Sequence, residues 1–472
     1  MTDLDLLAIL GVVVILAACA NATAGWRRAP AAFTALLKSI AVSAASGALI
    51  GYAVAYHMIA NAPSAELLQS ASNLAGSQPS GAHSQQTASA LKQTLASLIA
   101  SQPGRAGRRS SYLIVGGDDN KSSYTSTELY NADSNSFFPG PNMITARSGH
   151  TVALLTGGPN AGKLLVAGGG RTWGEYLTTT ELYDPAANAF MAGPTMNFAR
   201  YGAVAVVLPN GRVMIAGGTL VGQLNSTELY DPVTNRFLPP AQTATMTVPR
   251  RCGPITVLLT TGPNAGKVLF AGGFGIGQFG SGYLASSELY DPSTNTFVSG
   301  PPMVEARANA TGALLGNGNV LIAGGFNGSS GMASTEIYQA SSNSFVPGPA
   351  LSMGRANAVA TLLTSGPNAG DVLIAGGFPG CCHETAVAST EIYQSATNTI
   401  VPGPAMSAAR QFPTANLLTT GLHAGDVLIA GGYNASGVLI SSDLYQAGSN
   451  SFVVGPNMTV ARQAAAAVSL AQ

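Results

Sequence analysis

The chain has 472 residues, of which only 9% are charged, and its 21 basic and 21 acidic side chains cancel. This balance excludes a chain kept disordered by charge, and no basic tail is present to bind a nucleic acid. The four cysteines, Cys19, Cys252, Cys381 and Cys382, have neither the CxxC spacing of a zinc site nor the pattern of a disulfide framework. The composition therefore predicts no cofactor.

The first sixty residues predict a membrane anchor. Residues 6–24 and residues 39–60 contain no charged side chain, and each run is long enough to cross a hydrocarbon layer of about 30 Å as a helix. Between the two runs lie Arg27, Arg28 and Lys38. By the positive-inside rule this connecting loop is cytoplasmic. Everything after residue 60 is then expected on the extracytoplasmic side, periplasmic or extracellular.

Two features of the anchor have more than one interpretation. The sequence LAAC, which ends at Cys19, resembles a lipobox, but the acidic N-terminal tail disfavours a cleaved signal peptide. Ser43, Gly47 and Gly51 are spaced four residues apart and give the second helix a face of small residues. We interpret this face as packing against the first helix, with the helix of a protein partner as the alternative.

Residues 61–110 predict a linker rich in Ala, Ser and Gln, with a short helix over residues 87–100. The linker ends in an arginine cluster at residues 105–109. Such a cluster is typical of a solvated boundary, and contact with anionic lipid or with a protein partner is the alternative.

From residue 111 to residue 472 the chain is a repeat. Gly-Gly pairs recur every 49 to 55 residues, beginning at residues 116, 168, 217, 272, 324, 376 and 431. Each unit has a strand of small residues, an apolar strand ending in Gly-Gly, a strand of the type STELYDP, a short strand with an aromatic residue, and then Pro, Met and Arg. Four short strands form one antiparallel sheet, and seven such sheets bury their faces by stacking in a ring.

The order of these signals resembles the kelch repeat, as in propellers of the kelch and galactose-oxidase type, over about 360 residues. The resemblance implies an all-β, seven-bladed β-propeller. One departure is consistent, because the fourth-strand aromatic residue, usually tryptophan in kelch repeats, is replaced by Phe137, Phe190, Phe237, Phe297, Phe345, Ile400 and Phe452. These side chains still fill an apolar slot between blades, so the fold prediction is unchanged.

The two ends of the repeat region are complementary. The first unit lacks the strand of small residues, and the chain ends in ARQAAAAVSLAQ, which is such a strand without a successor. We therefore expect residues 464–470 to pair beside residues 112–115. This pairing closes the ring and removes two exposed sheet edges.

Each unit also carries one acidic and one basic side chain. The acidic residues are Glu128, Glu181, Glu228, Glu288, Glu336, Glu391 and Asp443. The basic residues are Arg147, Arg200, Arg250 or Arg251, Arg307, Arg355, Arg410 and Arg462. We interpret them as buried ion pairs that hold one unit to the next, because a residue repeated seven times is typical of a structural role. A ring of catalytic carboxylates is the alternative.

Candidate ligand-binding residues lie in the loops between the second and third strands, which differ from unit to unit. Alternating strand directions place all these loops on one face. The candidates are Asp118, Asp119, Tyr124, Arg171, Trp173, Glu175, Tyr176, Phe279, Tyr283, His383 and Glu384. Aromatic residues mixed with a few polar groups suit a sugar or a peptide.

The stretch Cys381-Cys382-His383-Glu384 is the one local cluster with metal-binding chemistry, because thiolates and imidazoles bind copper or zinc. Adjacent residues seldom all point at one ion. An inert loop or a disulfide between the neighbouring cysteines is therefore the favoured interpretation. The repeat region has only three histidines, His150, His383 and His423, so we do not predict the copper chemistry of galactose oxidase.

These observations predict a membrane-anchored, extracytoplasmic propeller that acts as a binding or scaffold module for protein or glycan ligands. No constellation of catalytic residues is evident. Two alternatives stay open, namely a carbohydrate-acting enzyme of the kelch epimerase or oxidase type and an accessory subunit of a larger membrane complex.

Overall fold

The computed structural model describes residues 112–470, apart from residues 172–173, 221, 223, 278–279 and 381–385. The predicted membrane helices, the linker, Cys19 and the small-residue face lie outside the described residues. Within the described part of the chain, no helix has the length and hydropathy of a membrane span.

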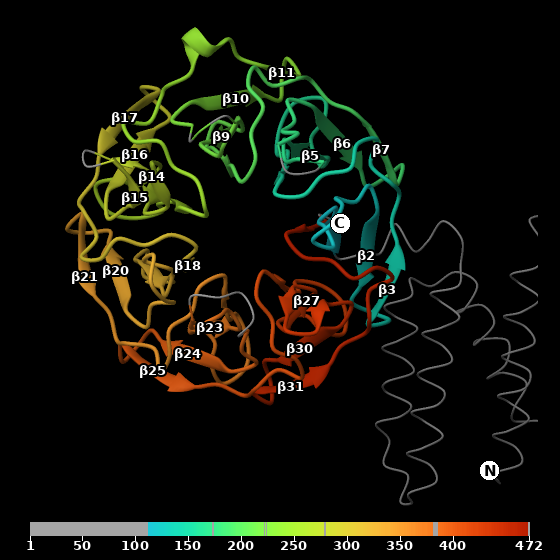
Figure 1. Ribbon diagram of the computed structural model, residues 1–472, viewed down its shortest axis with the longest axis vertical. Helices are drawn as coiled ribbons and strands as arrows, with labels where there is room; N and C mark the ends of the chain where they lie inside the picture. Colours follow the sequence, from blue (N-terminus) through green and yellow to red (C-terminus); the bar gives the residue numbers. More distant parts are fainter. Residues whose placement is uncertain are drawn as a thin grey trace, which may run out of the picture. The chain divides into compact units, whose positions relative to one another are not determined.

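The described residues form an all-β, seven-bladed propeller in which each blade is a four-stranded antiparallel sheet (Figure 1). The seven innermost strands contact one another in succession around the axis. Blades are numbered by the order of their Gly-Gly pairs, and their strands are given from the axis outward.

Blades 1 to 3 have the following strands. Blade 1 contains β32 (Ala466–Ser469), β1 (Tyr112–Val115), β2 (Thr127–Asn131) and β3 (Ser136–Pro139). Blade 2 contains β4 (Thr151–Leu154), β5 (Leu164–Ala167), β6 (Thr180–Asp184) and β7 (Ala189–Ala192). Blade 3 contains β8 (Val204–Val207), β9 (Val213–Ala216), β10 (Thr227–Asp231) and β11 (Arg236–Phe237), followed by a 3₁₀ turn at Pro240–Gln242.

Blades 4 to 7 repeat this plan. Blade 4 contains β12 (Ile255–Leu258), β13 (Val268–Ala271), β16 (Ser287–Asp291) and β17 (Thr296–Ser299), with the hairpin β14 (Phe274–Gly277) and β15 (Gly280–Tyr283) in its loop. Blade 5 contains β18 (Thr311–Leu314), β19 (Val320–Ala323), β20 (Thr335–Gln339) and β21 (Ser344–Pro347). Blade 6 contains β22 (Val359–Leu362), β23 (Val372–Ala375), β24 (Thr390–Gln394) and β25 (Thr399–Pro402). Blade 7 contains β26 (Thr414–Leu417), β27 (Val427–Ala430), β30 (Ser442–Gln446) and β31 (Ser451–Val454), with the short hairpin β28 (Tyr433–Asn434) and β29 (Gly437–Val438).

The last strand closes the ring, which confirms the pairing predicted from the two ends of the repeat. β32 pairs antiparallel with β1, with Tyr112 opposite Ser469 and Val115 opposite Ala466. Leu470 follows the strand and packs into the apolar cluster between blades 1 and 2. The C-terminal segment therefore completes both a sheet and a core.

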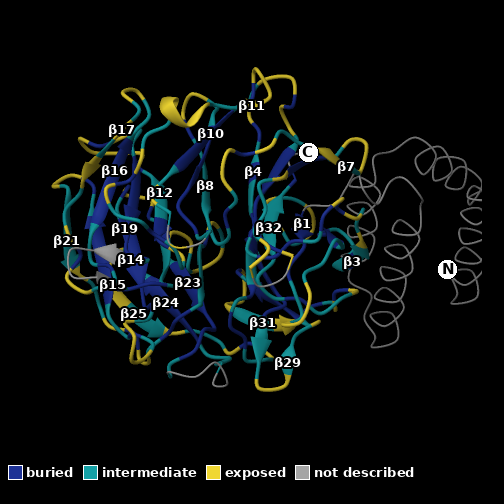
Figure 2. Cartoon of the chain, turned by 45° about the horizontal axis from the view of Figure 1, so that its top comes forward, coloured by how far each residue is buried: buried dark blue, intermediate teal, exposed yellow. Residues whose placement is uncertain are grey.

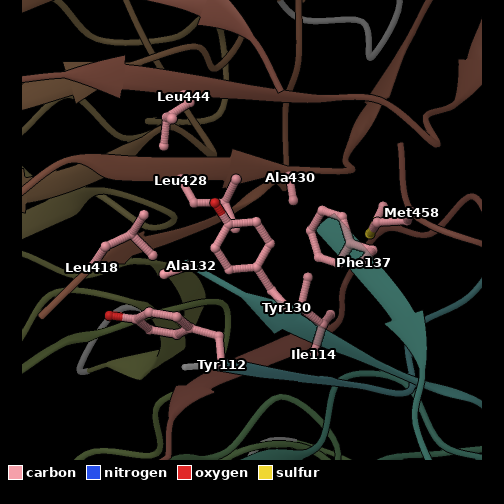
Figure 3. Packing of buried hydrophobic residues seen from close by; sticks show 10 residues of the cluster. All are labelled: Tyr112, Ile114, Tyr130, Ala132, Phe137, Leu418, Leu428, Ala430, Leu444 and Met458. Atoms are coloured by element: carbon pink, nitrogen blue, oxygen red, sulfur yellow. The ribbon is translucent and has the colours of Figure 1, made fainter. Parts of the chain in front are cut away.

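The second strand of each blade is buried along its whole length, and Figure 2 shows these strands in dark blue. Each apolar cluster combines residues from two successive blades. Figure 3 shows the cluster between blades 7 and 1, where Tyr112 and Tyr130 of blade 1 lie beside Leu428 and Leu444 of blade 7. Burying each such side chain contributes about 1.5–3 kcal/mol. The motif VLIAGG recurs because every blade makes this two-sided contact.

The Gly-Gly pair is required because the chain passes directly over it. Gly324 has φ +64°, and a Cβ atom there would lie 2.2 Å from the carbonyl oxygen of Arg355. Gly325, with φ +104°, donates its amide to that same oxygen at 2.7 Å. Only glycine combines this backbone conformation with so close an approach.

Each tyrosine of the ELYDP strand is tied to the hairpin that follows it. The Tyr338 hydroxyl donates to Oδ1 of Asn343 at 2.9 Å, and Asn343 holds the left-handed turn with φ +52°. The same bond, to the asparagine five residues on, occurs in all seven blades. The sequence analysis did not predict this hydrogen bond.

The stereotyped loops between first and second strands join blades in pairs. The GPNAG loops of blades 4 and 6 reach the next blade, where Asn264 donates to the Tyr338 hydroxyl at 3.4 Å and Asn368 to the Tyr445 hydroxyl at 3.3 Å. Blades 3 and 5 have shorter turns, around Asn210 and Asn317, at the same place. Long and short loops therefore alternate from blade 2 to blade 6.

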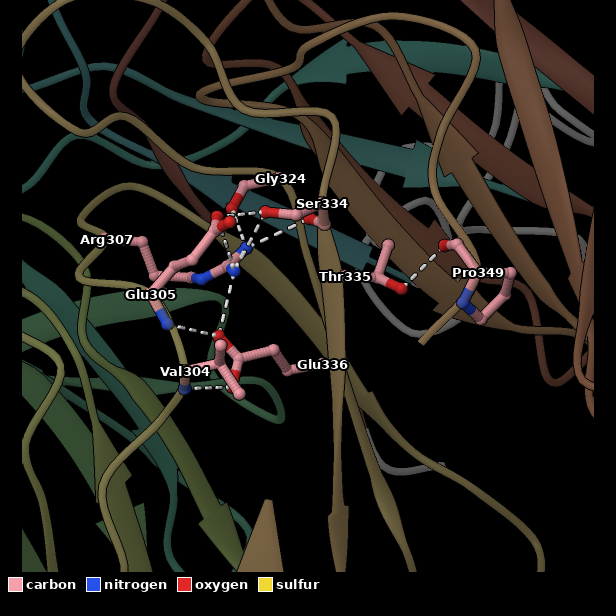
Figure 4. Close-up of polar contacts among 8 residues, drawn as sticks. All are labelled: Val304, Glu305, Arg307, Gly324, Ser334, Thr335, Glu336 and Pro349. Atoms are coloured by element: carbon pink, nitrogen blue, oxygen red, sulfur yellow. Dashed lines mark hydrogen bonds and ion pairs between the residues drawn. The ribbon is translucent and has the colours of Figure 1, made fainter. Parts of the chain in front are cut away.

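The acidic and basic residues of each repeat form buried ion pairs (Figure 4). In blade 5, Arg307 Nη2 lies 2.9 Å from Glu336 Oε1, and Arg307 Nη1 donates to the carbonyl oxygens of Gly324 and Ser334 at 2.7 and 3.0 Å. Burial lowers the pKa of the Arg307 guanidinium, and the charge of Glu336 opposes this shift. The seven pairs are Arg147–Glu181, Arg200–Glu228, Arg250–Glu288, Arg307–Glu336, Arg355–Glu391, Arg410–Asp443 and Arg462–Glu128.

The carboxylates also hold the short segment that leads from one blade into the next. We call this segment the blade linker and its paired arginine the linker arginine. The amides of Val304 and Glu305 donate to the two oxygens of Glu336 at 2.7 and 3.0 Å. In blade 4 the paired arginine is Arg250, not Arg251. The carboxylates therefore have hydrogen-bond donors on both sides, as burial of a charge demands.

Removing the closing strand tests the ring. A chain ending at Arg462 loses β32 and exposes the edge of β1, so we expect a melting temperature lower by more than 5 °C and aggregation on heating. Thermal unfolding with light scattering measures both. A chain ending at Leu470, which keeps β32, is the control. A monomeric Arg462-terminated chain melting within about 2 °C of the control would contradict the closure.

Removing one partner of a buried ion pair tests how much these pairs stabilise the propeller. Glu336→Ala removes the buried counter-charge of Arg307 and leaves only the half-exposed Glu305, whose carboxylate lies 3.6 Å from the guanidinium, so we expect a loss of about 3–5 kcal/mol in the free energy of unfolding. Denaturant titration gives this value. Asp231→Ala, which breaks the more exposed Arg212–Asp231 pair at 3.4 Å, should cost less than about 1 kcal/mol. Equal effects of the two substitutions would refute the structural role.

Candidate ligand-binding site

The Gly-Gly loops and the blade-to-blade linkers meet on one face of the propeller, which we call the loop face. In every blade the residue after the linker arginine forms an antiparallel bridge with the residue after the Gly-Gly pair. The seven bridges are Gln463–Asp118, Ser148–Gly170, Tyr201–Thr219, Arg251–Phe274, Ala308–Phe326, Ala356–Phe378 and Gln411–Tyr433. These fourteen positions surround the propeller axis, and they differ strongly between blades.

Among the described residues, backbone hydrogen bonds join five of the seven pairs of neighbouring blades near the axis on the loop face. The amide of Asn357 donates to the carbonyl oxygen of Asn309 at 3.1 Å. The amide of Asn309 donates in turn to the carbonyl oxygen of Cys252 at 3.0 Å. Equivalent bonds join Phe412 to Asn357, Gly202 to Gly149 and Gly149 to Ala464. All these residues have positive φ values between 48° and 64°. The bonds hold neighbouring blades at a fixed spacing where the side chains of the bridges converge.

Four aromatic residues of blades 4 to 6, which we call the aromatic arc, follow one another along the loop face. Ring centroids are 5.2 Å apart for Phe274 and Tyr283, 5.7 Å for Tyr283 and Phe326, and 6.0 Å for Phe326 and Phe378. Each such pair contributes about 0.5–1.5 kcal/mol beyond area burial, so the rings are well fixed. Phe378 is buried, whereas the other three are partly exposed.

The opposite part of the face, in blades 1 to 3, is polar. Asp118 accepts a hydrogen bond from Nε2 of Gln463 at 3.0 Å. The Tyr201 ring lies 5.8 Å from that of Tyr176, and burial and the charge of Asp118 raise the Tyr201 pKa. We call Asp118, Gln463, Tyr176 and Tyr201 the polar arc. The two arcs give the loop face an apolar side and a hydrogen-bonding side.

The structure brings only some of the predicted residues together. Asp118, Tyr176 and Tyr283 belong to the two arcs. Arg171 and Glu175 are exposed in the loop of blade 2, where the Arg171 carbonyl accepts the amide of Ser123 at 3.3 Å.

Two further predicted residues have local roles. Asp119 accepts the amides of Ser122 and Lys121 at 2.8 and 3.0 Å, and these bonds lower its pKa. Tyr124 lies under the guanidinium of Arg462, 5.7 Å from the ring centroid, and therefore packs on the ion pair. Trp173, Phe279, His383 and Glu384, with Cys381 and Cys382, lie outside the described residues. Among the described side chains, no group of three His, Cys, Asp or Glu could hold a metal ion.

The sequence analysis did not select Tyr201, Arg251 or Phe274 as ligand-binding candidates. It searched only the loops after the Gly-Gly pairs, which exclude Tyr201 and Arg251, and in the loop of blade 4 it selected Phe279 and Tyr283. The signal was present for Tyr201 and Arg251, since the residue after the linker arginine changes from blade to blade while the arginine itself repeats. Only the fold shows that this position lies beside the axis.

His150 lies at the seam between blades 1 and 2, directly before the inner strand of blade 2. Blades 3, 5 and 6 have alanine at the equivalent position. A Cβ atom on Gly116 would lie 2.9 Å from His150 Cε1, so the ring packs against blade 1. The Arg147 carbonyl favours the protonated ring, but neither ring nitrogen has a partner in hydrogen-bond geometry. Burial, with the Arg147 charge adding to it, lowers the pKa of His150 from 6.5 to about 3.

The buried imidazole predicts an acid-sensitive seam. Below pH 6.5 the imidazole of His150 is protonated in the unfolded chain, whereas in the folded chain it stays neutral down to about pH 3. The contribution of His150 to the free energy of unfolding is therefore fully present above pH 6.5 and is lost as the pH falls from 6.5 to 3. We expect His150 to contribute about 2–3 kcal/mol to the loss between pH 7 and pH 4. Denaturant titrations at both pH values should show a smaller loss for His150→Ala. An unchanged loss in the variant would show that the imidazole is not the cause.

Comparison with known proteins adds little to this description. The sequence matches no family model and no curated protein. One solved structure, described as "Structure of YjhT", aligns with 14% sequence identity and a TM-score of 0.48, over 66% of this chain and 98% of that chain. The assignment of the propeller rests on the seven sheets and their closure.

Proposed function

We propose that this chain is a kelch-type propeller that acts as a binding module and holds its ligand on the loop face around the axis. The observation that carries the proposal is the contrast between a repeated scaffold and unequal bridge positions. Ion pairs, Gly-Gly pairs and tyrosine–asparagine bonds recur in all blades, whereas the bridges range from Ala356–Phe378 to Gln463–Asp118. Function is expected where a repeated fold departs from its repeat.

The chemistry of the two arcs favours a glycan as the ligand. Sugar rings present apolar C–H faces that stack on aromatic side chains, and their hydroxyl groups need hydrogen-bonding partners. Tyr283 and Phe326 offer partly exposed rings, while Asp118 and Tyr201 offer polar groups on the other side of the axis. A few polar groups beside apolar surface is the usual composition of a small-ligand site.

We also propose that the N-terminal segment is a membrane anchor and that the propeller is extracytoplasmic. The support lies in the sequence, where residues 6–24 and 39–60 carry no charged side chain and Arg27, Arg28 and Lys38 lie between them.

Glycan binding is testable by truncating one aromatic residue in each arc. We expect Tyr283→Ala and Tyr176→Ala to lower the affinity for a glycan bound by the full chain at least tenfold, with melting temperatures within a few degrees of wild type. Screening on a glycan array, followed by calorimetry of the hit, provides the measurement. Met191→Ala, on the outer strand β7, should bind normally.

A fluorescently labelled form of the glycan found on the array tests the location of the propeller. Intact spheroplasts that express the full chain should bind the fluorescent glycan, and those expressing Tyr283→Ala should not. Binding only after permeabilisation would place the propeller in the cytoplasm. If the chain captures a protein but no glycan, and if neither tyrosine substitution affects this capture, the proposed site is contradicted.

A further inference from the structure

Blade 4 carries the one basic side chain among the fourteen bridge positions. The residue after the linker arginine is uncharged in six blades, and it is Arg251 in blade 4. Since Arg250 already forms the buried pair with Glu288, Arg251 is an additional guanidinium beside the axis.

Blade 4 also has one additional residue at this point. In the other blades a single left-handed residue and one further residue separate the bridge position from the inner strand. In blade 4, Cys252 and Gly253 are both left-handed, with φ +57° and +61°, and Pro254 follows. The Cys252 carbonyl still accepts the amide of Asn309, so the extra residue bulges at Gly253, which is exposed. Such insertions reposition the neighbouring side chain.

Arg251 is held in place but has no counter-charge. Its guanidinium carbon lies 4.9 Å from the centroid of Phe274. No carboxylate lies within 4.0 Å of it among the described residues, whereas all seven linker arginines are paired. Its Nε is buried without a hydrogen-bond partner, as are those of five linker arginines, but unlike them it has no carboxylate beside it among the described residues. A partly desolvated guanidinium with free donors binds an anion favourably, and the stacking contact already orients its planar face.

The surroundings of Arg251 connect it to the aromatic arc. Its guanidinium stacks on Phe274, and the Phe274 ring centroid lies 5.2 Å from that of Tyr283. Burial raises the pKa of Tyr283, and the positive charge of Arg251 opposes this shift. An anion on Arg251 would therefore lie beside the aromatic arc.

We propose that Arg251 binds a carboxylate of the ligand, so that the glycan taken by the loop face is an acidic sugar. This inference rests on the proposed glycan-binding function and narrows its ligand class. A singly charged carboxylate matches one guanidinium, which donates two parallel hydrogen bonds to it. A doubly charged phosphate is less well matched, because no second cation accompanies Arg251 in the described bridges and Asp118 adds negative charge across the axis.

Matched sugars test the proposal with the full chain. D-galacturonate and its methyl ester differ in the charged carboxylate, and D-galactose lacks the carboxyl group altogether. We expect wild type to bind galacturonate at least tenfold more tightly than the ester, with the preference shrinking as salt is raised. Arg251→Gln should weaken galacturonate binding about tenfold to hundredfold and leave ester binding within twofold. Calorimetric titration gives all these affinities.

Two controls accompany the titrations. Arg236→Gln removes an exposed arginine from the outer strand β11 and should keep the wild-type preference. Arg251→Lys keeps the charge without the planar fork and should recover part of the affinity. Thermal unfolding of Arg251→Gln should match wild type, because the side chain has no ion pair in the described structure.

The outcomes separate the two proposals. Equal binding of galacturonate and its ester, or a preference that survives Arg251→Gln, would overturn the role of Arg251. Binding of neutral sugars that depends on Tyr283 would still support the glycan site. Failure of every sugar to bind would overturn both.

Discussion

The linker arginine is the interaction on which the rest of the propeller depends, because one residue holds two blades. The carbonyl oxygen of Arg355 accepts the amide of Gly325 in blade 5, and its guanidinium donates to the carbonyl of Gly376 in blade 6. The same double contact is made by all seven linker arginines. A buried guanidinium is costly unless its charge and most of its donors find partners, so the partner carboxylate and the Gly-Gly pair are required with it.

This constraint separates structure from function along the chain. The elements that satisfy the arginine recur in every blade, with aspartate in place of glutamate only at Asp443. The bridge residues lie next to them, one position away from the arginine and one from the Gly-Gly pair, and their side chains are free to differ. Phe274 and Asp118 thus occupy equivalent backbone positions with unrelated chemistry. A rigid repeated frame presents a non-repeated surface, which is how propellers accommodate different ligands.

The closing blade extends the same argument to the ends of the chain. Arg462 forms its ion pair with Glu128 and donates to the carbonyl of Gly116. The last blade linker therefore contacts blade 1 in the same way as every other linker contacts the blade that follows it. Strand pairing of β32 with β1 then adds backbone hydrogen bonds to the side-chain contact. Because the ends of the repeat region meet in one blade, the ring forms only when the whole repeat region is present.

The sequence by itself determined the seven blades, the closing strand and one acid and one base in each repeat, because these features are written in local patterns that recur. Periodic apolar strands and Gly-Gly pairs require no knowledge of distant contacts. Tertiary structure decided which of two adjacent arginines is paired, and it left Arg251 stacked on Phe274. It also buried His150 at the seam and placed Tyr201 beside Tyr176. These outcomes depend on how neighbouring blades stack around the axis, and a pattern within one repeat does not record which side chains of the next repeat it will meet.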